Sequence, residues 1–298
     1  MKTISLVSVP FDLGAGKRGV NQGPEGLLSE GLADLLKGLD VDIRNHKVLN
    51  RIEPFLGTND SHMKNYREVL EINRQLAECI SEIMSSDDFP LILGGDHSIA
   101  IGTIAGLAQR YKRLGVIWID AHGDVNTPYT SPSGNIHGMS LAASLGFGDP
   151  VLTGLGGITP KIKTENVVII GARDLDPEEK RFIREHNITC YTMHDIDELG
   201  MAKVMKEAIH IVSQETDGVH LSFDIDSVDP IEAPGTGTPV KGGLNYREAH
   251  LAMEILHQSG ILTSAEFVEV NPSLDDEDRK TSKIAVELIE SLFGKRII

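Results

Sequence analysis

The sequence predicts an α/β protein of three layers, α-β-α, in which helices cover both faces of a mainly parallel sheet of about eight strands. Short β-branched runs alternate with longer segments of helical spacing along the whole chain. Several of the short runs are apolar throughout, as strands buried on both faces of a sheet are. No repeat, low-complexity tract or long linker interrupts this alternation. Residues 1–298 are therefore expected to form a single domain.

The predicted elements follow one another in a regular order. The strands cover Ile4–Val9, Val41–Val48, Leu91–Leu93, Val116–Asp120, Val167–Ile170, Ile188–Tyr191, Val219–Asp226 and Ala265–Val270. The helices cover Pro24–Leu36, His62–Ser85, Ser98–Tyr111, Pro177–His186, Met201–Ser213, Tyr246–Ser259 and Lys280–Phe293. The longest stretch without periodicity, Val125–Gly138, is expected to be a functional loop, since long structureless loops in compact domains usually carry function.

Composition excludes several classes of protein. The 28 basic and 44 acidic residues give a net charge of −16, which argues against nucleic-acid binding. Cys79 and Cys190 are too few and too far apart for a disulfide framework or a thiol metal site, which indicates a reducing compartment. No apolar run approaches the roughly 18 residues of a membrane span, and the apolar stretch at the start lacks the features of a signal peptide. We expect a cytoplasmic protein with neither nucleic-acid nor membrane partners.

Polar residues follow four of the predicted strands. The segments concerned are Gly94–Ser98, Asp120–Asp124, Asp224–Asp229 and Glu269–Pro272. Ligands of parallel sheets bind at the carboxyl ends of the strands, so these segments are expected to meet. If the backbone stays extended past each strand, alternate residues point to one side. That spacing relates Asp120, His122 and Asp124 in one segment, and Asp224 and Asp226 in another.

Such crowding of carboxylates predicts a metal site. Buried carboxylates repel one another and resist desolvation unless cations lie between them. The number of Asp and His side chains exceeds the need of one ion, which suggests two ions bridged by shared carboxylates. Oxygen and nitrogen donors without cysteine suit Mn²⁺, although Fe, Co and Ni remain open. Two such ions activate a water molecule and indicate hydrolysis. Asp96 by itself is better explained as a helix cap.

The same segments carry a resemblance to a known family. Gly94–Ser98, Asp120–Asp124 and Ser222–Asp226 resemble the three signature blocks of the ureohydrolases. The loop Ser131–Met139 resembles the arginase branch in particular, as do Gly237–Pro239 and Glu269–Pro272. Matching blocks run from Gly19 to Asn271 in the order of the family. One departure is Ser227, where many arginases have Gly, at a position that is not a ligand.

The resemblance implies an arginase/deacetylase-like fold and a hydrolase acting on linear amidines. The implied reaction is manganese-dependent hydrolysis of L-arginine to L-ornithine and urea, in which a metal-bridging hydroxide attacks the guanidinium carbon. It belongs to arginine metabolism and the urea cycle. Two Mn²⁺ per subunit are implied, one held by His97, Asp120, Asp124 and Asp224 and the other by His122, Asp120, Asp224 and Asp226. A homotrimer or homohexamer is implied as well.

The resemblance also assigns roles in catalysis and substrate binding. Asp124 would orient the hydroxide, and His137 would be a proton shuttle, since the ordinary pKa of histidine is about 6.5. Glu269 would hold the guanidinium through a charge-assisted pair of hydrogen bonds. The α-carboxylate and α-amino groups would be recognised by Asn126, Ser133, Asn135 and Asp176, while Thr238 would line the metal end of the cleft.

Simpler explanations exist for single members of this set. Asn126, Ser133 and Asn135 are common turn formers, and Asp176 before Pro177 is a typical helix start. An agmatinase or another guanidino-hydrolase would share the metal residues. Agmatine has no carboxylate, however, so such an enzyme would not need the loop around Ser133 and Asn135. A non-catalytic metal-binding module would need neither His137 nor Glu269.

A glycine pattern favours a different class of protein. Gly14–Gly19 matches G-x-G-x-x-G after the first strand, and Asp40 and Asp42 follow about twenty residues later, as in a nucleotide-dependent oxidoreductase. Three residues separate the strand from the first glycine, however, and the next helix is expected only at Pro24. The crowded carboxylates would also go unexplained. A lone glycine fingerprint is weak evidence.

Overall fold

One sheet of eight strands organises the computed structural model, which describes residues 2–55 and 60–296. The strands are β1 (Lys2–Ser8), β2 (Val41–Val48), β3 (Phe89–Leu93), β4 (Leu114–Ile119), β5 (Val167–Ala172), β6 (Thr189–Thr192), β7 (Gly218–Asp224) and β8 (Ser264–Val268). Their order across the sheet is β2-β1-β3-β8-β7-β4-β5-β6, and all neighbours are parallel. The predicted fold class is confirmed. Residues 1, 56–59 and 297–298 of the predicted domain lie outside the described residues.

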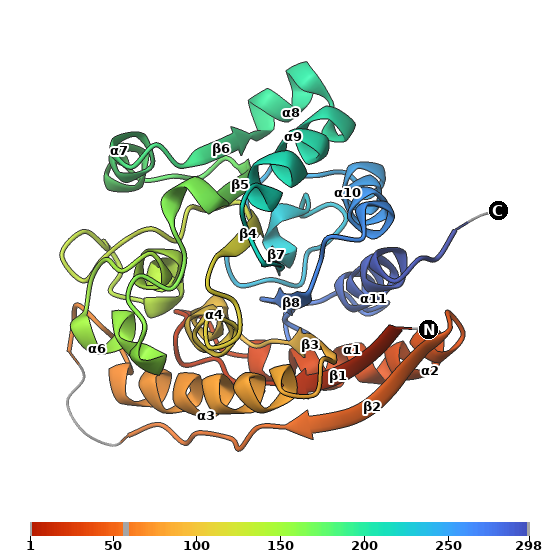
Figure 1. Cartoon of the computed structure of the whole chain (residues 1–298), viewed down its shortest axis with the longest axis horizontal. Helices are drawn as coiled ribbons and strands as arrows, with labels where there is room; N and C mark the ends of the chain where they lie inside the picture. Colours follow the sequence, from red (N-terminus) through yellow and green to blue (C-terminus); the bar gives the residue numbers. More distant parts are fainter. Residues whose placement is uncertain (1, 56–59, 297–298) are drawn as a thin grey trace.

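Helices separate the strands along the chain. They are α1 (Gly23–Ser29), α2 (Leu32–Lys37), α3 (Tyr66–Met84), α4 (Ala100–Leu107), α5 (Ser140–Ser144), α6 (Pro150–Thr153), α7 (Pro177–Glu185), α8 (Met193–Leu199), α9 (Met201–Ser213), α10 (Tyr246–Ser259) and α11 (Lys280–Leu292). Figure 1 shows their arrangement around the strands. Among the described residues, no helix combines the length and the apolar character that crossing a membrane requires.

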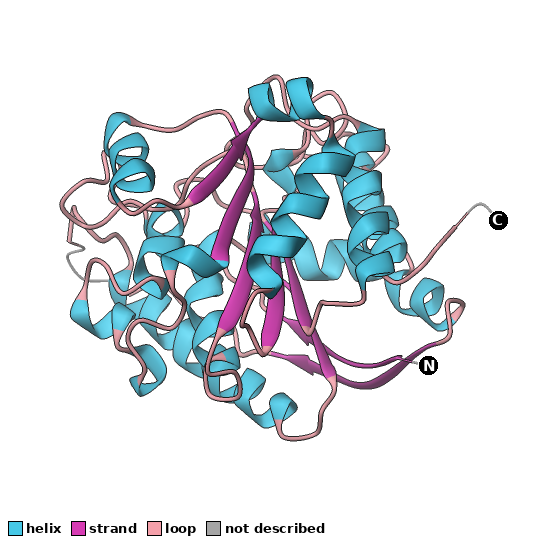
Figure 2. Cartoon of the chain, turned by 45° about the horizontal axis from the view of Figure 1, so that its top comes forward, coloured by secondary structure: helices cyan, strands magenta, loops and turns pink. Residues whose placement is uncertain are grey.

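The sheet divides the apolar interior into two cores. Side chains alternate between the faces of a strand, so Ile117 and Ile119 of β4 belong to one core and Val116 and Trp118 to the other. Helices α1, α2 and α8 to α11 complete the first core, and α3 to α7 complete the second. Figure 2 shows the sheet between these helices. The predicted three-layer arrangement follows directly from this division.

Several predicted boundaries are wrong. The helices predicted over His62–Ser85 and Ser98–Tyr111 cover only Tyr66–Met84 and Ala100–Leu107, and the strand predicted to reach Val270 ends at Val268. The helix predicted over Pro24–Leu36 is two helices, because Gly31 between them has a left-handed φ of 86°. The strand predicted to reach Asp226 ends at Asp224, whose side chain accepts a hydrogen bond from the Asp226 amide and starts a 3-10 turn. The strand predicted to include Asp120 ends one residue earlier. The short helices α5, α6 and α8 are not predicted.

The strand order brings the four polar strand ends side by side. β3, β8, β7 and β4 are consecutive in the middle of the sheet. β4 follows β3 in the sequence but lies three places away in the sheet, and the chain turns back after β6 to place β7 and β8 between them. The connections that leave β4 and β7, which are neighbours, therefore run in opposite directions across the sheet. Open α/β sheets bind ligands where the strand order reverses in this way. The fold therefore concentrates the predicted chemistry at the carboxyl edge of the four central strands.

Candidate metal centre and active site

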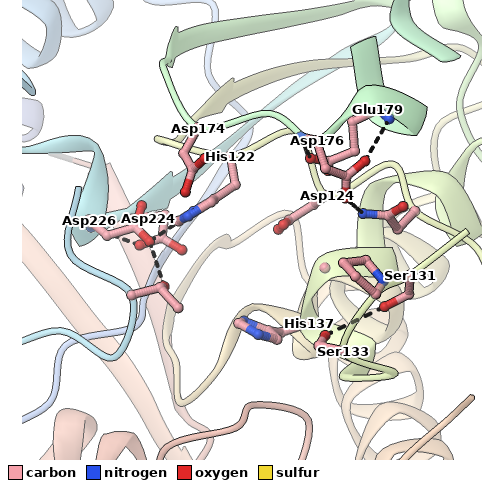
Figure 3. Close-up of a pocket in the computed structure, with 14 residues that line it drawn as sticks. His122, Asp124, Ser131, Ser133, His137, Asp174, Asp176, Glu179, Asp224 and Asp226 are labelled. Carbon is pink, nitrogen blue, oxygen red and sulfur yellow. Dashed lines mark hydrogen bonds and ion pairs between the residues drawn. The ribbon is translucent and has the colours of Figure 1, made fainter. Parts of the chain in front are cut away.

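A cavity of about 250 Å³ opens at this edge of the sheet (Figure 3). Its wall includes nine of the predicted site residues, namely His122, Asp124, Asn126, Ser133, His137, Asp176, Asp224, Asp226 and Thr238. Ser131, Pro132, Gly138, Asp174 and Glu179 complete the wall. The other predicted residues, His97, Asp120, Asn135 and Glu269, do not line this cavity.

His97 lies behind the cavity and faces three carboxylates. Its Nδ1 atom is 3.1 Å from one oxygen each of Asp120, Asp124 and Asp224. The ring is buried and stacks on Trp118, with the ring centres 4.1 Å apart and the planes 7° from parallel. This stacking holds the ring so that Nδ1 points at the carboxylates.

Asp120 connects this group to a second one. The indole of Trp118 donates to one of its oxygens at 3.0 Å, and the His122 amide donates to the other at 2.7 Å. His122 Nδ1 lies 3.3 Å from Asp120 and 3.1 Å from Asp226. Asp226 in turn accepts hydrogen bonds from Thr238 Oγ1 at 3.0 Å and from the Ala121 amide at 3.3 Å.

The local backbone produces this convergence in an unexpected way. The extended backbone assumed for Asp120, His122 and Asp124 ends with β4, and Asp124 has a left-handed φ of 51°. Its side chain therefore reaches the group through a turn and accepts from Ser140 Oγ at 3.4 Å. Asp226 likewise belongs to a 3-10 turn. The predicted residues meet, but the predicted alternation is not the reason.

The electrostatics of the cluster favour a bound cation. Burial raises the pKa of Asp124, Asp224 and Asp226, and neighbouring carboxylates raise it further. Although burial opposes a charged imidazole, the surrounding carboxylates raise the pKa of His97 well above its usual value. Buried acids that repel one another in this way require positive charge between them.

The donor atoms fit metal ions. His97, Asp120 and Asp224 offer atoms within 4.8 Å of one another, and so do Asp120, His122 and Asp226. Asp120 belongs to both groups. His97 Nδ1 is buried without a hydrogen-bond partner among the described residues, as expected of an atom whose natural partner is a metal. Carboxylate and imidazole donors are suited to divalent cations of the Mn²⁺ or Zn²⁺ type.

The loop between β4 and α5 forms the outer wall of the cavity. Asn126 Nδ2 donates to Asp176 at 2.8 Å, which joins the loop to the start of α7. Asp176 also caps this helix by accepting from the Glu178 and Glu179 amides. Ser133 is exposed and accepts from the Asn135 amide at 3.1 Å. The Asn135 side chain lies close to Gly16 and does not itself line the cavity.

His137 and Glu269 form a pair beside the carboxylates. His137 Nδ1 lies 3.2 Å from Glu269 Oε1, and the same oxygen accepts from the His97 amide at 2.9 Å. Although burial lowers it, the hydrogen bond and charge of Glu269 raise the pKa of His137 to about 9. Glu269 is held at a left-handed φ of 63°, and its amide donates to Gly95.

Sequence reasoning missed several residues at this site. Asp174 faces the cavity from the β5–α7 connection, Glu179 from the first turn of α7, and Ser131 from the loop (Figure 3). Asp174 lies two residues before Asp176, a spacing that could have pointed to it. The guanidinium of Arg173 donates to the backbone carbonyls of Gly171, Asp226, Ser227, Val228 and Val240. It thereby fixes the turn that carries Asp226.

The glycine pattern at Gly14–Gly19 belongs to this site as well. The Gly14 amide donates to Asp96 at 2.7 Å, and Asp96 caps the 3-10 turn that begins at His97. A Cβ atom at Gly14 would collide with Ser98. α1 begins only at Gly23, after a separate 3-10 turn, so Gly19 is outside the first turn of the helix. The segment packs against Asp96 and Ser98, on either side of His97, and lacks the helix position of a nucleotide-binding loop.

Fold and site together define an α/β protein with a carboxylate–histidine metal centre at the carboxyl edge of a parallel sheet. The family model described as "Arginase family" matches residues 2–294. The chain is 55% identical to arginase of Bacillus caldovelox over 300 residues, which cover 100% of both chains. It is 54% identical to arginase of Brevibacillus brevis over 297 residues, with 100% of this chain and 99% of the relative covered. The chain belongs to the arginase family and is a hydrolase of that family.

Solved structures agree with this assignment. Arginase from Bacillus cereus superposes with a TM-score of 0.95 at 52% identity, covering 100% of both chains. Arginase from Entamoeba histolytica, solved in complex with L-ornithine, gives a TM-score of 0.88 at 34% identity, with 99% of this chain and 98% of that chain covered. The arginase-like fold expected from the resemblance is confirmed.

Proposed function

We propose that this protein hydrolyses L-arginine to L-ornithine and urea, as arginases do. The observation that carries the proposal is the arrangement of the cavity. One end holds His122, Asp224 and Asp226, and the opposite wall holds Ser133 and Asp176 (Figure 3). Asn126, which also lines the cavity, donates to Asp176. Identity to curated arginases over the full chain supports the same activity.

We propose two Mn²⁺ ions per subunit. His97, Asp120, Asp124 and Asp224 would hold one, and His122, Asp120, Asp224 and Asp226 would hold the other. The two overlapping donor groups that share Asp120 support two ions. Bound divalent ions would supply a water of lowered pKa, and therefore a nucleophile at neutral pH.

The protein's own residues position the reactants. Glu269 would hold the guanidinium through a charge-assisted pair of hydrogen bonds, and the contacts of its Oε1 with the His97 amide and His137 Nδ1 fix the carboxylate in place. Asp124 would accept a hydrogen bond from the attacking water. His137, whose pKa of about 9 keeps it protonated at neutral pH, would donate a proton to the leaving amine.

Recognition of the amino-acid end decides the substrate. Asn126, Ser133 and Asn135 would hold the α-carboxylate, and Asp176 would reach the α-amino group. The hydrogen bond between Asn126 and Asp176 supports this role because it holds the two side chains together in the cavity wall. Thr238, hydrogen-bonded to Asp226, would line the metal end.

We further propose that residues 1–298 form one domain that assembles as a homotrimer or homohexamer and acts in the cytoplasm, in arginine metabolism and the urea cycle. The single sheet, which takes strands from both halves of the chain, supports one domain. The two cysteines, Cys79 and Cys190, are free in the structure, as proteins of a reducing compartment require.

The deciding experiment compares urea release from L-arginine and from agmatine by the same Mn²⁺-loaded protein. We expect urea from arginine only, since agmatine lacks the carboxylate that the loop is proposed to bind. Urea from agmatine only would overturn the substrate assignment. The double variant Ser133→Ala with Asn135→Ala should raise KM for arginine at least about 10-fold and leave Mn²⁺ affinity unchanged. Equal loss of arginine use and Mn²⁺ affinity would contradict the role of the loop.

A further inference from the structure

A buried polar network extends behind His97, away from the cavity. His97 Nε2 lies 2.8 Å from Ser222 Oγ on β7, and Ser222 Oγ donates to Glu266 Oε1 on β8 at 2.7 Å. Thr103 Oγ1, on α4, donates to Glu266 Oε2 at 2.7 Å. All four side chains are at most 1% exposed. Nothing in the proposed reaction uses Glu266, Ser222 or Thr103.

Register explains how the network reaches the metal centre. Ser222 and Glu266 are direct partners in the parallel pairing of β7 and β8, and His220 is paired with Ser264 two residues earlier. Alternate residues of a strand share a face, so His220, Ser222 and Asp224 follow one line toward the carboxyl edge. The line ends at the carboxylate that faces His97.

Glu266 acts as a pure acceptor in this network. Burial favours the neutral acid, but the interaction with His220, whose Nε2 lies 3.4 Å from Oε1, lowers the pKa of Glu266. An ionised carboxylate can only accept hydrogen bonds. The single proton of the Ser222 hydroxyl is therefore committed to Glu266, and Ser222 can offer His97 only a lone pair.

The direction of these bonds determines which nitrogen of His97 is protonated. Because Ser222 must accept, His97 Nε2 must carry the proton that it donates. In the neutral ring, which is the form that binds a metal, Nδ1 then keeps its lone pair for the space that it shares with Asp120, Asp124 and Asp224. A neutral imidazole binds metal only through the nitrogen that lacks a proton.

We propose that Glu266 is a positioning residue that, through Ser222, keeps the proton of His97 on Nε2 and so makes Nδ1 a ligand for one of the two ions. This inference rests on the proposed metal centre and deepens it. Without an acceptor at position 266, the Ser222 hydroxyl is free to donate to Nε2. His97 would then carry its proton on Nδ1, where it competes with the metal.

The test measures Mn²⁺ binding to the metal-free full chain, with electron paramagnetic resonance as the readout. We expect Glu266→Leu to lower the affinity for one of the two ions about 10- to 100-fold, the range found when partners of metal-ligating histidines are removed. The other ion should be affected much less. Glu266→Gln should restore most of the affinity because its amide oxygen can still accept from Ser222. Ser222→Ala removes the hydroxyl that connects Glu266 to His97 and should lower the affinity for the same ion. This variant replaces Glu266→Leu in the test if Glu266→Leu does not fold.

Thr103→Val is the matched control. It removes a buried hydrogen bond to the same carboxylate but leaves the Ser222 side intact, so Mn²⁺ affinity should change less than about 3-fold. A double-mutant cycle separates positioning from general damage. In a His97→Asn background, Glu266→Leu should have no further effect on affinity, since its target is gone.

Two results would overturn the proposal. Unchanged affinity of Glu266→Leu, or an equal loss in the presence and absence of His97, would show that Glu266 does not act through His97. Either result would leave the proposed function intact if the wild-type protein binds Mn²⁺ and releases urea from arginine. Failure of the wild-type protein to bind Mn²⁺ would overturn both proposals.

Discussion

Glu179 lies in the cavity wall, although its side chain is only 5% exposed. Its carboxylate accepts from the Asp176 amide at 3.2 Å and from the Val125 amide at 3.4 Å. Burial raises the pKa of Glu179, and the charge of Asp124 raises it further, to about 8. In the metal-free native protein, this pKa keeps a proton on the side chain at neutral pH, because an ionised carboxylate in this position would face Asp124 without a cation between them.

A pH dependence of stability follows from this raised pKa. An exposed glutamate in the unfolded chain has its ordinary pKa of about 4.3, so between about pH 5 and pH 8 the native state binds more protons than the unfolded state. The stabilisation is complete below the unfolded pKa and is lost as pH rises through about 8. When metal-free protein is unfolded with urea, the free energy of unfolding of the wild type should fall over this pH range by at least about 1 kcal/mol more than that of Glu179→Gln.

The two proteins should have similar stability near pH 5, because glutamine resembles the protonated acid. Glu178→Gln, at a neighbouring side chain that is 39% exposed, is the control and should follow the wild-type profile. Parallel profiles of wild type and Glu179→Gln would contradict the buried, protonated state of Glu179.

Single residues also show how far the site could be predicted. The metal residues follow strands and share recognisable spacings, so their gathering could be predicted, whereas their roles remain proposals. Glu179 could not be separated from an ordinary residue of the first helical turn. Glu266 carried a signal that was overlooked, since a carboxylate within a strand buried on both faces requires a partner. The partner itself, Ser222, depends on strand order.

At the scale of elements, most strands and long helices are visible in the apolar pattern, and one of the errors occurs where a single backbone angle decides. Gly31 interrupts a helical pattern that is otherwise continuous from Pro24 to Leu36, because its φ of 86° turns the chain between α1 and α2. Apolar spacing does not report such an angle. Helices α5, α6 and α8 contain four to seven residues, too few for a period of 3.6 to be recognised.

Substitution of Gly31 tests this interruption. No atom lies within 4 Å of a Cβ added at this position, so only the left-handed conformation opposes a side chain. Gly31→Ala should lower the free energy of unfolding by about 1–2 kcal/mol, and Gly31→Asn by less, because asparagine tolerates this conformation better. Chemical denaturation of both variants measures the difference. Equal or higher stability of Gly31→Ala would favour the continuous helix that the sequence predicts.

At the scale of the whole molecule, the order of the strands decides what the chain can do. The sequence identifies four strand ends that carry polar residues, but their adjacency depends on which crossover follows each strand. β7 and β8, the last strands of the chain, fill the centre of the sheet between β3 and β4. The fold thus places its most repulsive group of charges at its centre, in a protein whose net charge is already −16. Cations at this place would relieve repulsion that all four central strands experience.

Metal binding should therefore stabilise the whole molecule. An ion that binds only the native state adds about 2.7 kcal/mol when its concentration is 100 times its dissociation constant, and two ions add more. We expect Mn²⁺ to raise the Tm of chelator-treated protein by at least about 4 °C, given the size of the chain. Differential scanning calorimetry measures the shift.

The double variant Asp120→Asn with Asp226→Asn should reduce the shift in Tm, since both groups of donor atoms lose carboxylates. Ca²⁺, which prefers six to eight oxygen ligands, should shift the Tm less than Mn²⁺ does. A Tm independent of Mn²⁺ would mean that the carboxylates at the centre of the sheet are stabilised without metal.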